Sequence, residues 1–146
     1  MKKFKTVKYT IHSHKLQSHG FTIAMISDLH NVELGKKNEN LLQALQEAKP
    51  DIICIAGDLV LGKKEKSVKI AYDFIKRAVK IAPIYYGLGN HEQRMKKYPQ
   101  VYGEEYRIFE KKIQKLGVTM LENSSSFLKI KGEKIQISSL ALPEEY

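Results

Sequence analysis

Three short apolar runs in the sequence each end in polar side chains that can bind a metal ion or move a proton. The strands expected at these runs, with the residues that follow them, are 21–27 with Asp28 and His30, 51–56 with Gly57 and Asp58, and 84–88 with Gly89, Asn90, His91 and Glu92. Nearly continuous apolar runs of this length are typical of parallel strands that are covered on both faces. We therefore predict three central strands whose carboxyl ends carry chemically active side chains.

Apolar residues recur at helical spacing between and after these strands. One helix is capped by Asn38 or Asn40 and ends at Pro50, a second spans 67–80, and a third ends at Gly117. Their apolar faces are formed by Leu41, Leu42, Leu45 and Ala48, by Ala71, Phe74, Ile75, Ala78 and Val79, and by Tyr106, Phe109, Ile113 and Leu116. Stripes of this kind indicate core packing rather than a cofactor site.

Both ends of the chain have patterns of exposed or half-exposed strands. Residues 5–12 alternate loosely and predict a strand on which His12 and His14 share a face. We interpret this histidine pair as surface residues rather than as metal ligands. The elements expected toward the C-terminus are a loop at 98–103, a strand at 118–121, and a hairpin that joins 127–130 to 135–140.

The alternation of strands and helices predicts an α/β fold with a mostly parallel sheet. In such sheets, ligands bind beyond the carboxyl ends of the strands. The polar residues that fall at this edge by spacing alone are Asp28, His30, Asp58, Asn90 and His91. A candidate site at this edge is therefore expected.

Length and composition are those of one globular domain. The chain has 146 residues, of which 42% are hydrophobic and 28% charged, and we expect a single domain over 1–146. We find no apolar run long enough to cross a bilayer and no signal peptide in the first residues. The one cysteine, Cys54, excludes an internal disulfide framework. We therefore expect a cytoplasmic protein.

The formal net charge of +9 favours an anionic substrate over a neutral one. The lysines are scattered along the chain, with only short runs such as Lys63-Lys64. We see no arginine-rich segment or aromatic ladder that would mark a specific nucleic-acid site. The charge is therefore interpreted mainly as solvation.

Carboxylate, imidazole and amide groups together form a ligand set that suits Mn, Fe or Zn. Asp28 and His30 can both reach one ion where the chain opens from strand to loop, and Asp58 can bridge two ions through its two oxygens. Each motif alone is also compatible with an ordinary turn, because Asp, Asn and Gly are common turn residues. The coincidence of three such strand ends favours one shared site over three unrelated turns.

These motifs resemble a known family. Ser27–His30, Ala56–Asp58 and Gly89–Glu92, in this order, resemble the first three signatures of the calcineurin-like metallophosphoesterases. The resemblance covers roughly residues 7–142, the N-terminal half of that fold, and is strongest to the small bacterial phosphohydrolases. It implies part of an α/β/β/α sandwich that hydrolyses phosphate mono- or diesters by two-metal hydroxide attack.

The resemblance also implies a role for each motif residue. The implied metal ligands are Asp28 and His30 for the first ion, Asp58 between the two ions, and Asn90 for the second ion. His91 would donate a proton or a hydrogen bond to the phosphate or the leaving oxygen. Glu92 would be the acid that orients His91.

The chain departs from the family pattern downstream of these motifs. Members carry further metal-binding histidines, whereas no histidine follows His91 here, and Leu61 stands where many members have a second acidic residue. We therefore expect a domain truncated at its C-terminus, impaired or inactive alone. An incomplete sheet is prone to association, so we also predict self-association, with elements exchanged between copies.

Two further hypotheses stay open. In the first hypothesis, the chain is a non-catalytic module that keeps the fold for association with a protein or a nucleic acid. In the second, another chain or a second copy supplies the missing histidines. The metal-site character of the retained residues favours the phosphohydrolase over the non-catalytic module.

Overall fold

The computed structural model describes residues 4–17, 20–64 and 67–141. Four strands form a parallel sheet in the order β1-β2-β3-β4, and two more form a separate antiparallel hairpin. The strands are β1 (Ile23–Ile26), β2 (Ile52–Ala56), β3 (Ile84–Gly87), β4 (Thr119–Leu121), β5 (Ser124–Ile130) and β6 (Glu133–Ser139). The helices are η1 (Lys36–Asn38), α1 (Glu39–Ala48), α2 (Lys69–Ala78), α3 (Asn90–Lys97), α4 (Pro99–Tyr102) and α5 (Glu105–Lys115). The predicted α/β fold with a C-terminal hairpin is confirmed.

The strand register brings the three predicted strand ends to one edge of the sheet. Ile26 pairs with Ile55, and Ala56 pairs with Gly87. Because the strands are parallel, the loops that follow β1, β2 and β3 all leave from this edge. The predicted site residues therefore start from adjacent positions.

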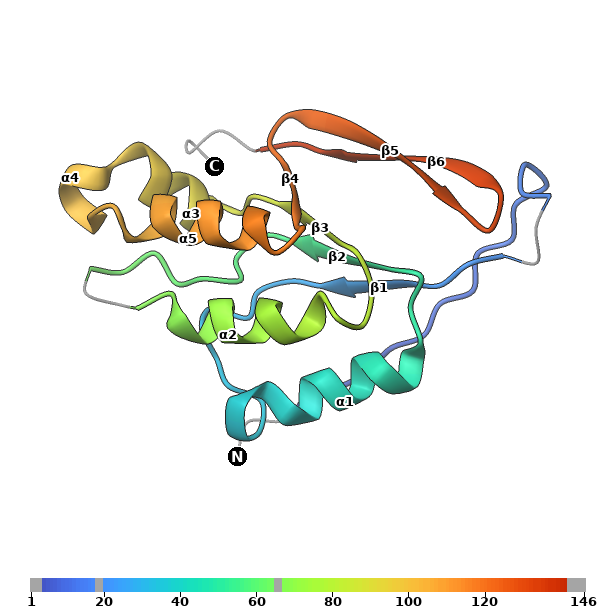
Figure 1. Cartoon of the computed structure of the whole chain (residues 1–146), viewed down its shortest axis with the longest axis horizontal. Coiled ribbons are helices and arrows are strands. Elements are labelled where there is room, and N and C mark those ends of the chain that lie inside the picture. The colour runs from blue at the N-terminus through green and yellow to red at the C-terminus, as the bar shows by residue number, and fades with distance from the viewer. Residues whose placement is uncertain (1–3, 18–19, 65–66, 142–146) are drawn as a thin grey trace.

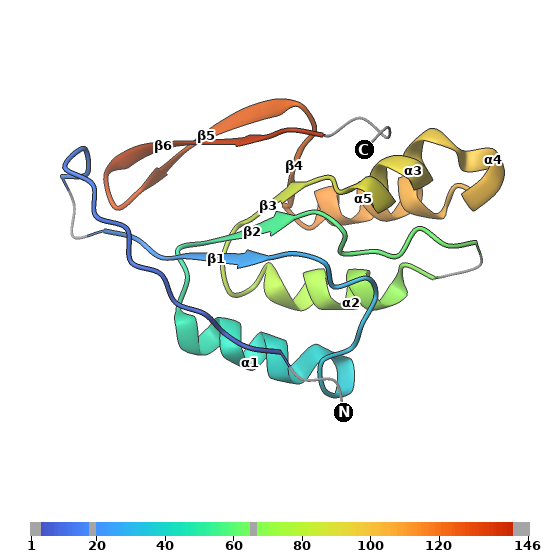
Figure 2. The same ribbon diagram turned by 180° about the vertical axis from the view of Figure 1, so that it is seen from behind.

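Helices cover one face of this sheet, with α1 and α2 along it, and the β5–β6 hairpin lies on the opposite side (Figures 1 and 2). The helix residues buried in the core are Leu41, Leu42 and Leu45, then Ala71, Phe74, Ile75 and Ala78, and finally Tyr106, Phe109 and Ile113. These match the apolar stripes expected from the sequence, except that Val79 and Leu116 are half-buried and Ala48 is exposed.

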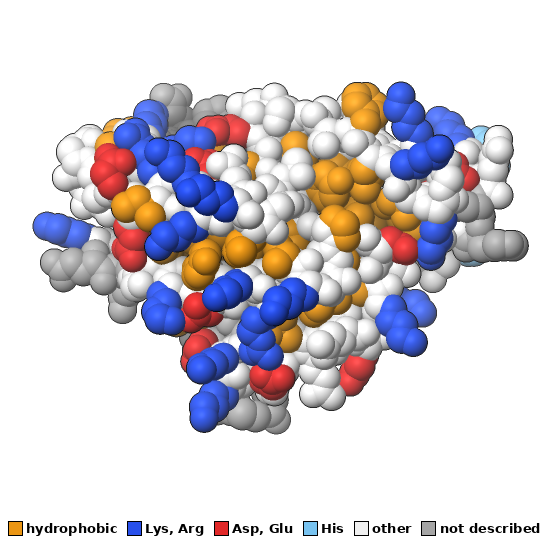
Figure 3. All heavy atoms as spheres, viewed as in Figure 1, with side chains coloured by type: hydrophobic (Ala, Val, Ile, Leu, Met, Phe, Trp, Pro, Cys, Tyr) orange, Lys and Arg blue, Asp and Glu red, His pale blue; other side chains and the backbone are white. Residues whose placement is uncertain are grey.

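The other face of the sheet is only partly covered. Ser139 of the hairpin lies so close over Gly87 that a Cβ on this glycine would overlap it. On β1, by contrast, Ile23 and Met25 are 45% and 71% exposed. Figure 3 shows apolar side chains between the hairpin and the helical layer, with Lys and Arg side chains around them. This face keeps an apolar surface beside the hairpin.

The N-terminal segment contradicts the strand predicted at 5–12. The described residues 4–17 contain no strand, and Val7, Tyr9 and Ile11 are 53%, 82% and 87% exposed. An alternating pattern produces a strand only where a neighbouring strand accepts its main-chain hydrogen bonds, and the described strands pair among themselves. His12 also lies on this exposed segment.

Two helical features differ from the expectation. The loop predicted at 98–103 contains α4, because Pro99 at its first turn is preset for a helix, and Gly103 at φ 75° ends it. Asn38 stands at the N-cap of α1, but its side chain accepts a hydrogen bond from the Leu34 N–H at 2.8 Å instead. Within the described part of the chain, no helix has the length and apolar character needed to cross a membrane.

Candidate metal centre

Several residues of the strand-end loops have left-handed main-chain conformations. Asp28, His30 and Asp58 have φ values of 57°, 49° and 53°. For residues other than glycine this region costs about 1–2 kcal/mol each, and such strain gathers at functional sites. Main-chain hydrogen bonds hold the two loops together, from the His30 N–H to the Asp58 carbonyl at 2.9 Å and from the Asp28 N–H to the Gly57 carbonyl at 3.3 Å.

Two glycines allow the loops after β2 and β3 to meet. A Cβ on Gly57 would lie 2.5 Å from the main-chain N and Cα of Gly89. A Cβ on Gly89 would overlap the carboxylate and the main-chain nitrogen of Asp58. Glycine at both positions therefore lets the Asp58 carboxylate lie directly against the start of α3.

The Asp58 carboxylate is the centre of the site. Its Oδ1 accepts a hydrogen bond from the His91 main-chain N–H at 3.0 Å. Its Oδ2 lies 3.8 Å from Nε2 of His30. In the amide orientation that satisfies both neighbours, Asn90 donates to Asp58 at 2.7 and 3.1 Å and accepts from Arg94 at 3.1 Å. The structure thus brings three of the four predicted ligands together.

The geometry fits a divalent cation. One ligand atom from each of His30, Asp58 and His91 lies within 4.8 Å of the others. Two donors that each bind an ion at about 2.0–2.2 Å are at most about 4.4 Å apart, so the 3.8 Å between His30 and Asp58 can hold one ion between them. Imidazole, carboxylate and amide donors suit Mn, Fe or Zn.

Asp28 lies outside this cluster. Its side chain is exposed, and its Oδ2 accepts a hydrogen bond from the hydroxyl of Ser27. Its main-chain N–H donates to the carbonyl of Gly57, in the loop that carries Asp58. The role of Asp28 as a ligand of the first ion stays a prediction.

Glu92 has a different role from the one expected. Its side chain is 0% exposed, and it points into the loop after β2 rather than at the His91 ring. Its carboxylate accepts five hydrogen bonds, from the main-chain N–H groups of Asp58, Leu59, Val60 and Gly89 and from the hydroxyl of Tyr86. The expectation that Glu92 orients the His91 ring is therefore corrected: Glu92 joins the two loops and supports Asp58 from behind.

Two buried phenols, those of Tyr86 and Tyr106, are influenced by this carboxylate. Burial, and then the charge of Glu92, raises the pKa of Tyr86 well above its ordinary value. The same two causes raise the pKa of Tyr106. Both phenols therefore remain protonated beside Glu92, and Tyr86 donates its hydrogen bond at 2.7 Å.

The His91 ring is held by a main-chain group and not by Glu92. The Gly62 N–H donates to Nδ1 of His91 at 2.9 Å. The rings of His30 and His91 meet edge to face, with centroids 4.9 Å apart. The sequence offered no signal for Gly62, because the contact uses an N–H that every residue except proline carries.

A comparison with protein families decides the assignment. The model of a family described as calcineurin-like phosphoesterase matches residues 21–143. The chain belongs to this family. A comparison with curated proteins finds no match. The resemblance drawn from the three motifs is thereby confirmed, and a phosphoesterase of this family uses divalent metal ions, which agrees with the donor set around Asp58.

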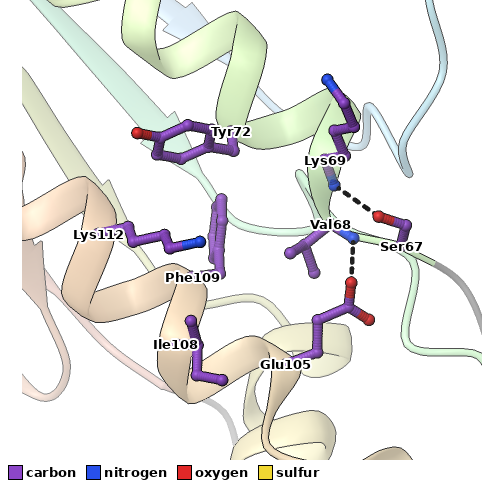
Figure 4. Close-up of a pocket in the computed structure, with 8 residues that line it drawn as sticks. All are labelled: Ser67, Val68, Lys69, Tyr72, Glu105, Ile108, Phe109 and Lys112. Carbon is purple, nitrogen blue, oxygen red and sulfur yellow. Dashed lines mark hydrogen bonds between the residues drawn. The ribbon is translucent and has the colours of Figure 1, made fainter.

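A pocket of this family member lies away from these residues. A pocket of about 220 Å³ is lined by residues of α2 and α5 and the residues before α2 (Figure 4). The Val68 N–H donates to the carboxylate of Glu105 at 3.2 Å, and Nζ of Lys112 lies 5.8 Å from the ring centre of Tyr72. None of the predicted site residues lines this pocket.

Proposed function

We propose that the chain is a metal-dependent phosphohydrolase that acts on phosphate mono- or diesters. The observation that carries the proposal is the contact of one carboxylate, Asp58, with His30, Asn90 and His91 at the carboxyl edge of a parallel sheet. Family membership and the possible metal ligands support it.

In this proposal, His30, Asp58 and Asn90 hold the cation. The Asn90 amide, which contacts the Asp58 carboxylate, would offer its oxygen to the ion. A cation held by these residues would polarise a phosphoryl oxygen as a Lewis acid and would acidify water. We keep Asp28 as a further ligand on the strength of the resemblance alone.

The other residues act on the substrate. His91 lies beside the ligands and donates a hydrogen bond to the phosphate or the leaving oxygen. Arg94, next to Asn90, adds positive charge at the mouth of the site. Both groups favour an anionic substrate, as does the net charge of +9.

We further propose that the chain alone binds one ion weakly and catalyses poorly. A second ion would have few donors, because no histidine follows His91 in the sequence. His12 lies on the exposed N-terminal segment and is not part of the cluster around Asp58.

The proposal is tested by hydrolysis of an aryl phosphate with added Mn²⁺. The wild-type chain should show slow hydrolysis that depends on Mn²⁺ and is abolished in Asp58→Asn. The matched control is Asp73→Asn on α2, whose carboxylate pairs with Lys69 on the surface. Equal rates for wild type and Asp58→Asn would overturn the proposed activity, and fast turnover by the monomer would overturn the proposed impairment.

Self-association and a non-catalytic role predict different results in hydrolysis and binding experiments. The exposed Ile23 and Met25 favour association of the open sheet face. A rate per chain that rises with chain concentration would indicate that a second copy completes the site. Binding of RNA or DNA that weakens with salt and needs no metal, without any hydrolysis, would support the non-catalytic module instead.

A further inference from the structure

We propose that the main-chain N–H of Gly62 is a positioning group that holds the His91 ring in one tautomer, with the proton on Nε2. The observation is the hydrogen bond from Gly62 to Nδ1 of His91 at 2.9 Å. The tautomer itself follows from this contact alone. Its catalytic consequence rests on the proposed phosphohydrolase function.

The tautomer follows from which ring nitrogen can donate a hydrogen bond and which can accept one. A neutral imidazole has one nitrogen that donates and one that accepts. A main-chain N–H can only donate, so Nδ1 must be the acceptor and must lack a proton. The ring proton is therefore on Nε2, and the Nδ1–H tautomer would place two hydrogens between Gly62 and His91.

Both ends of His91 are anchored, so the ring has little freedom to escape this contact. Its own main-chain N–H donates to Oδ1 of Asp58 at 3.0 Å. Gly62 is buried, and a Cβ built on it would lie 3.1 Å from Nδ1 and 3.1 Å from the carbonyl oxygen of His91. The loop after Asp58 thus packs directly on the ring that it orients.

The contact also separates two possible roles of His91. A histidine that binds a metal ion through one nitrogen normally donates a hydrogen bond from the other nitrogen. His91 has the opposite arrangement, because Nδ1 accepts from Gly62. Although His91 lies in the cluster with His30 and Asp58, its Nε2–H is therefore a hydrogen-bond donor to a substrate oxygen and not a metal ligand.

The tautomer is tested by ¹⁵N NMR of the histidine side chains in the full chain, without metal and with Mg²⁺, a diamagnetic ion. The His91 signals are identified by their loss in His91→Gln. We expect Nδ1 to resonate as an unprotonated nitrogen and Nε2 as a protonated one, in both samples. A protonated Nδ1, or loss of the Nε2 proton when Mg²⁺ binds, would overturn the proposal.

The positioning role is tested with two variants of Gly62. Gly62→Pro removes the N–H, whereas Gly62→Ala keeps it and reports the effect of the added methyl group. We expect the single-tautomer NMR pattern to persist in Gly62→Ala and to be lost in Gly62→Pro, with a kcat at least about tenfold below that of Gly62→Ala and a similar KM. Equal spectra and equal kcat values for the two variants would contradict it.

If Gly62→Pro does not fold, a main-chain ester at position 62 is the alternative variant. It replaces the N–H by an oxygen and adds no bulk. The ester should abolish the single-tautomer pattern, and an unchanged pattern would overturn the proposal. The NMR and kinetic results also separate this inference from the proposed function. If the tautomer is as expected but the wild-type chain hydrolyses no phosphate ester, the proposed function fails and the assignment of the Gly62 contact remains.

Discussion

The carboxylate of Glu92 accepts a hydrogen bond from the main-chain N–H of Asp58 at 2.9 Å. This contact joins the first turn of α3 to the loop after β2, and the adjacent N–H groups of Leu59 and Val60 donate to the same carboxylate. Because Glu92 is fully buried, it holds the main chain from which the Asp58 side chain extends toward His30. A residue that touches no substrate thus determines the geometry of the candidate metal centre.

Replacing Glu92 by glutamine should destabilise the fold. The amide NH₂ of Glu92→Gln would face main-chain N–H groups and leave buried donors without an acceptor, at a cost of about 2–4 kcal/mol in the free energy of unfolding. Urea denaturation measures this cost. The control is Glu47→Gln on the exposed side of α1, which should change stability by less than about 0.5 kcal/mol. If Glu92→Gln lowered the free energy of unfolding no more than Glu47→Gln does, the role of Glu92 in holding the two loops together would be contradicted.

A methyl group at position 89 should disrupt the metal centre. The Cβ of Gly89→Ala would overlap the Asp58 carboxylate, so Asp58 must move away from His30 and Mn²⁺ affinity should fall at least about tenfold. Calorimetric titration measures the affinity. Gly103→Ala is the control, since no atom beyond its chain neighbours lies within 4 Å of its Cβ position. Its φ of 75° is positive whereas that of Gly89 is −87°, so the control carries main-chain strain that Gly89→Ala does not. Equal affinities in the two variants would show that the close approach at Gly89 is unimportant.

Asp28→Asn tests the ligand that the structure leaves outside the cluster. If Asp28 binds the first ion as the family resemblance implies, the variant should lower Mn²⁺ affinity by about tenfold or more, because a neutral amide replaces a charged ligand. Ser27→Ala, which removes the hydroxyl that donates to Asp28, should leave the affinity nearly unchanged or raise it. Wild-type affinity in Asp28→Asn would remove Asp28 from the ligand set.

Stability should decrease at alkaline pH through Tyr86. Its pKa is raised in the folded chain by burial and by Glu92, so the folded state holds the phenol proton more tightly than the unfolded state. This contribution is complete below the unfolded pKa of about 10 and is lost as the pH rises above it. Urea denaturation at pH 8 and at higher pH should therefore show a shallower decrease in Tyr86→Phe. The exposed Tyr9→Phe should follow the wild type, and a Tyr86→Phe slope as steep as the wild type's would contradict this.

The strand ends could be predicted from the sequence because their evidence is local. An apolar run followed by Asp58, or by Asn90 and His91, predicts both a strand and the chemically active residues at its end. The parallel arrangement of the strands then brings these ends together. The helix at Asn90–Lys97 was not predicted, because its sequence is almost wholly polar and lacks the apolar period that marks a helix. Its folding depends on Glu92, which docks it onto the loop after β2.

Other features depend on partners that a sequence does not display. Residues 5–12 alternate like a strand but have no described strand beside them, and strand formation needs such a neighbour. The roles of Glu92 and Gly62 arise from contacts to residues about thirty positions away, made largely with main-chain groups. Main-chain partners carry no signature in side-chain identity, so only the structure can reveal them.

The central claim is that His30 and Asp58, from two neighbouring strand ends, hold one divalent cation. The most direct measurement is Mn²⁺ binding followed by electron paramagnetic resonance in the wild-type chain, His30→Gln and Asp58→Asn, with Asp73→Asn as the surface control. The account predicts one weak site that persists in the control and disappears in both His30→Gln and Asp58→Asn. Undiminished binding in Asp58→Asn, or no binding by the wild-type chain, would contradict it.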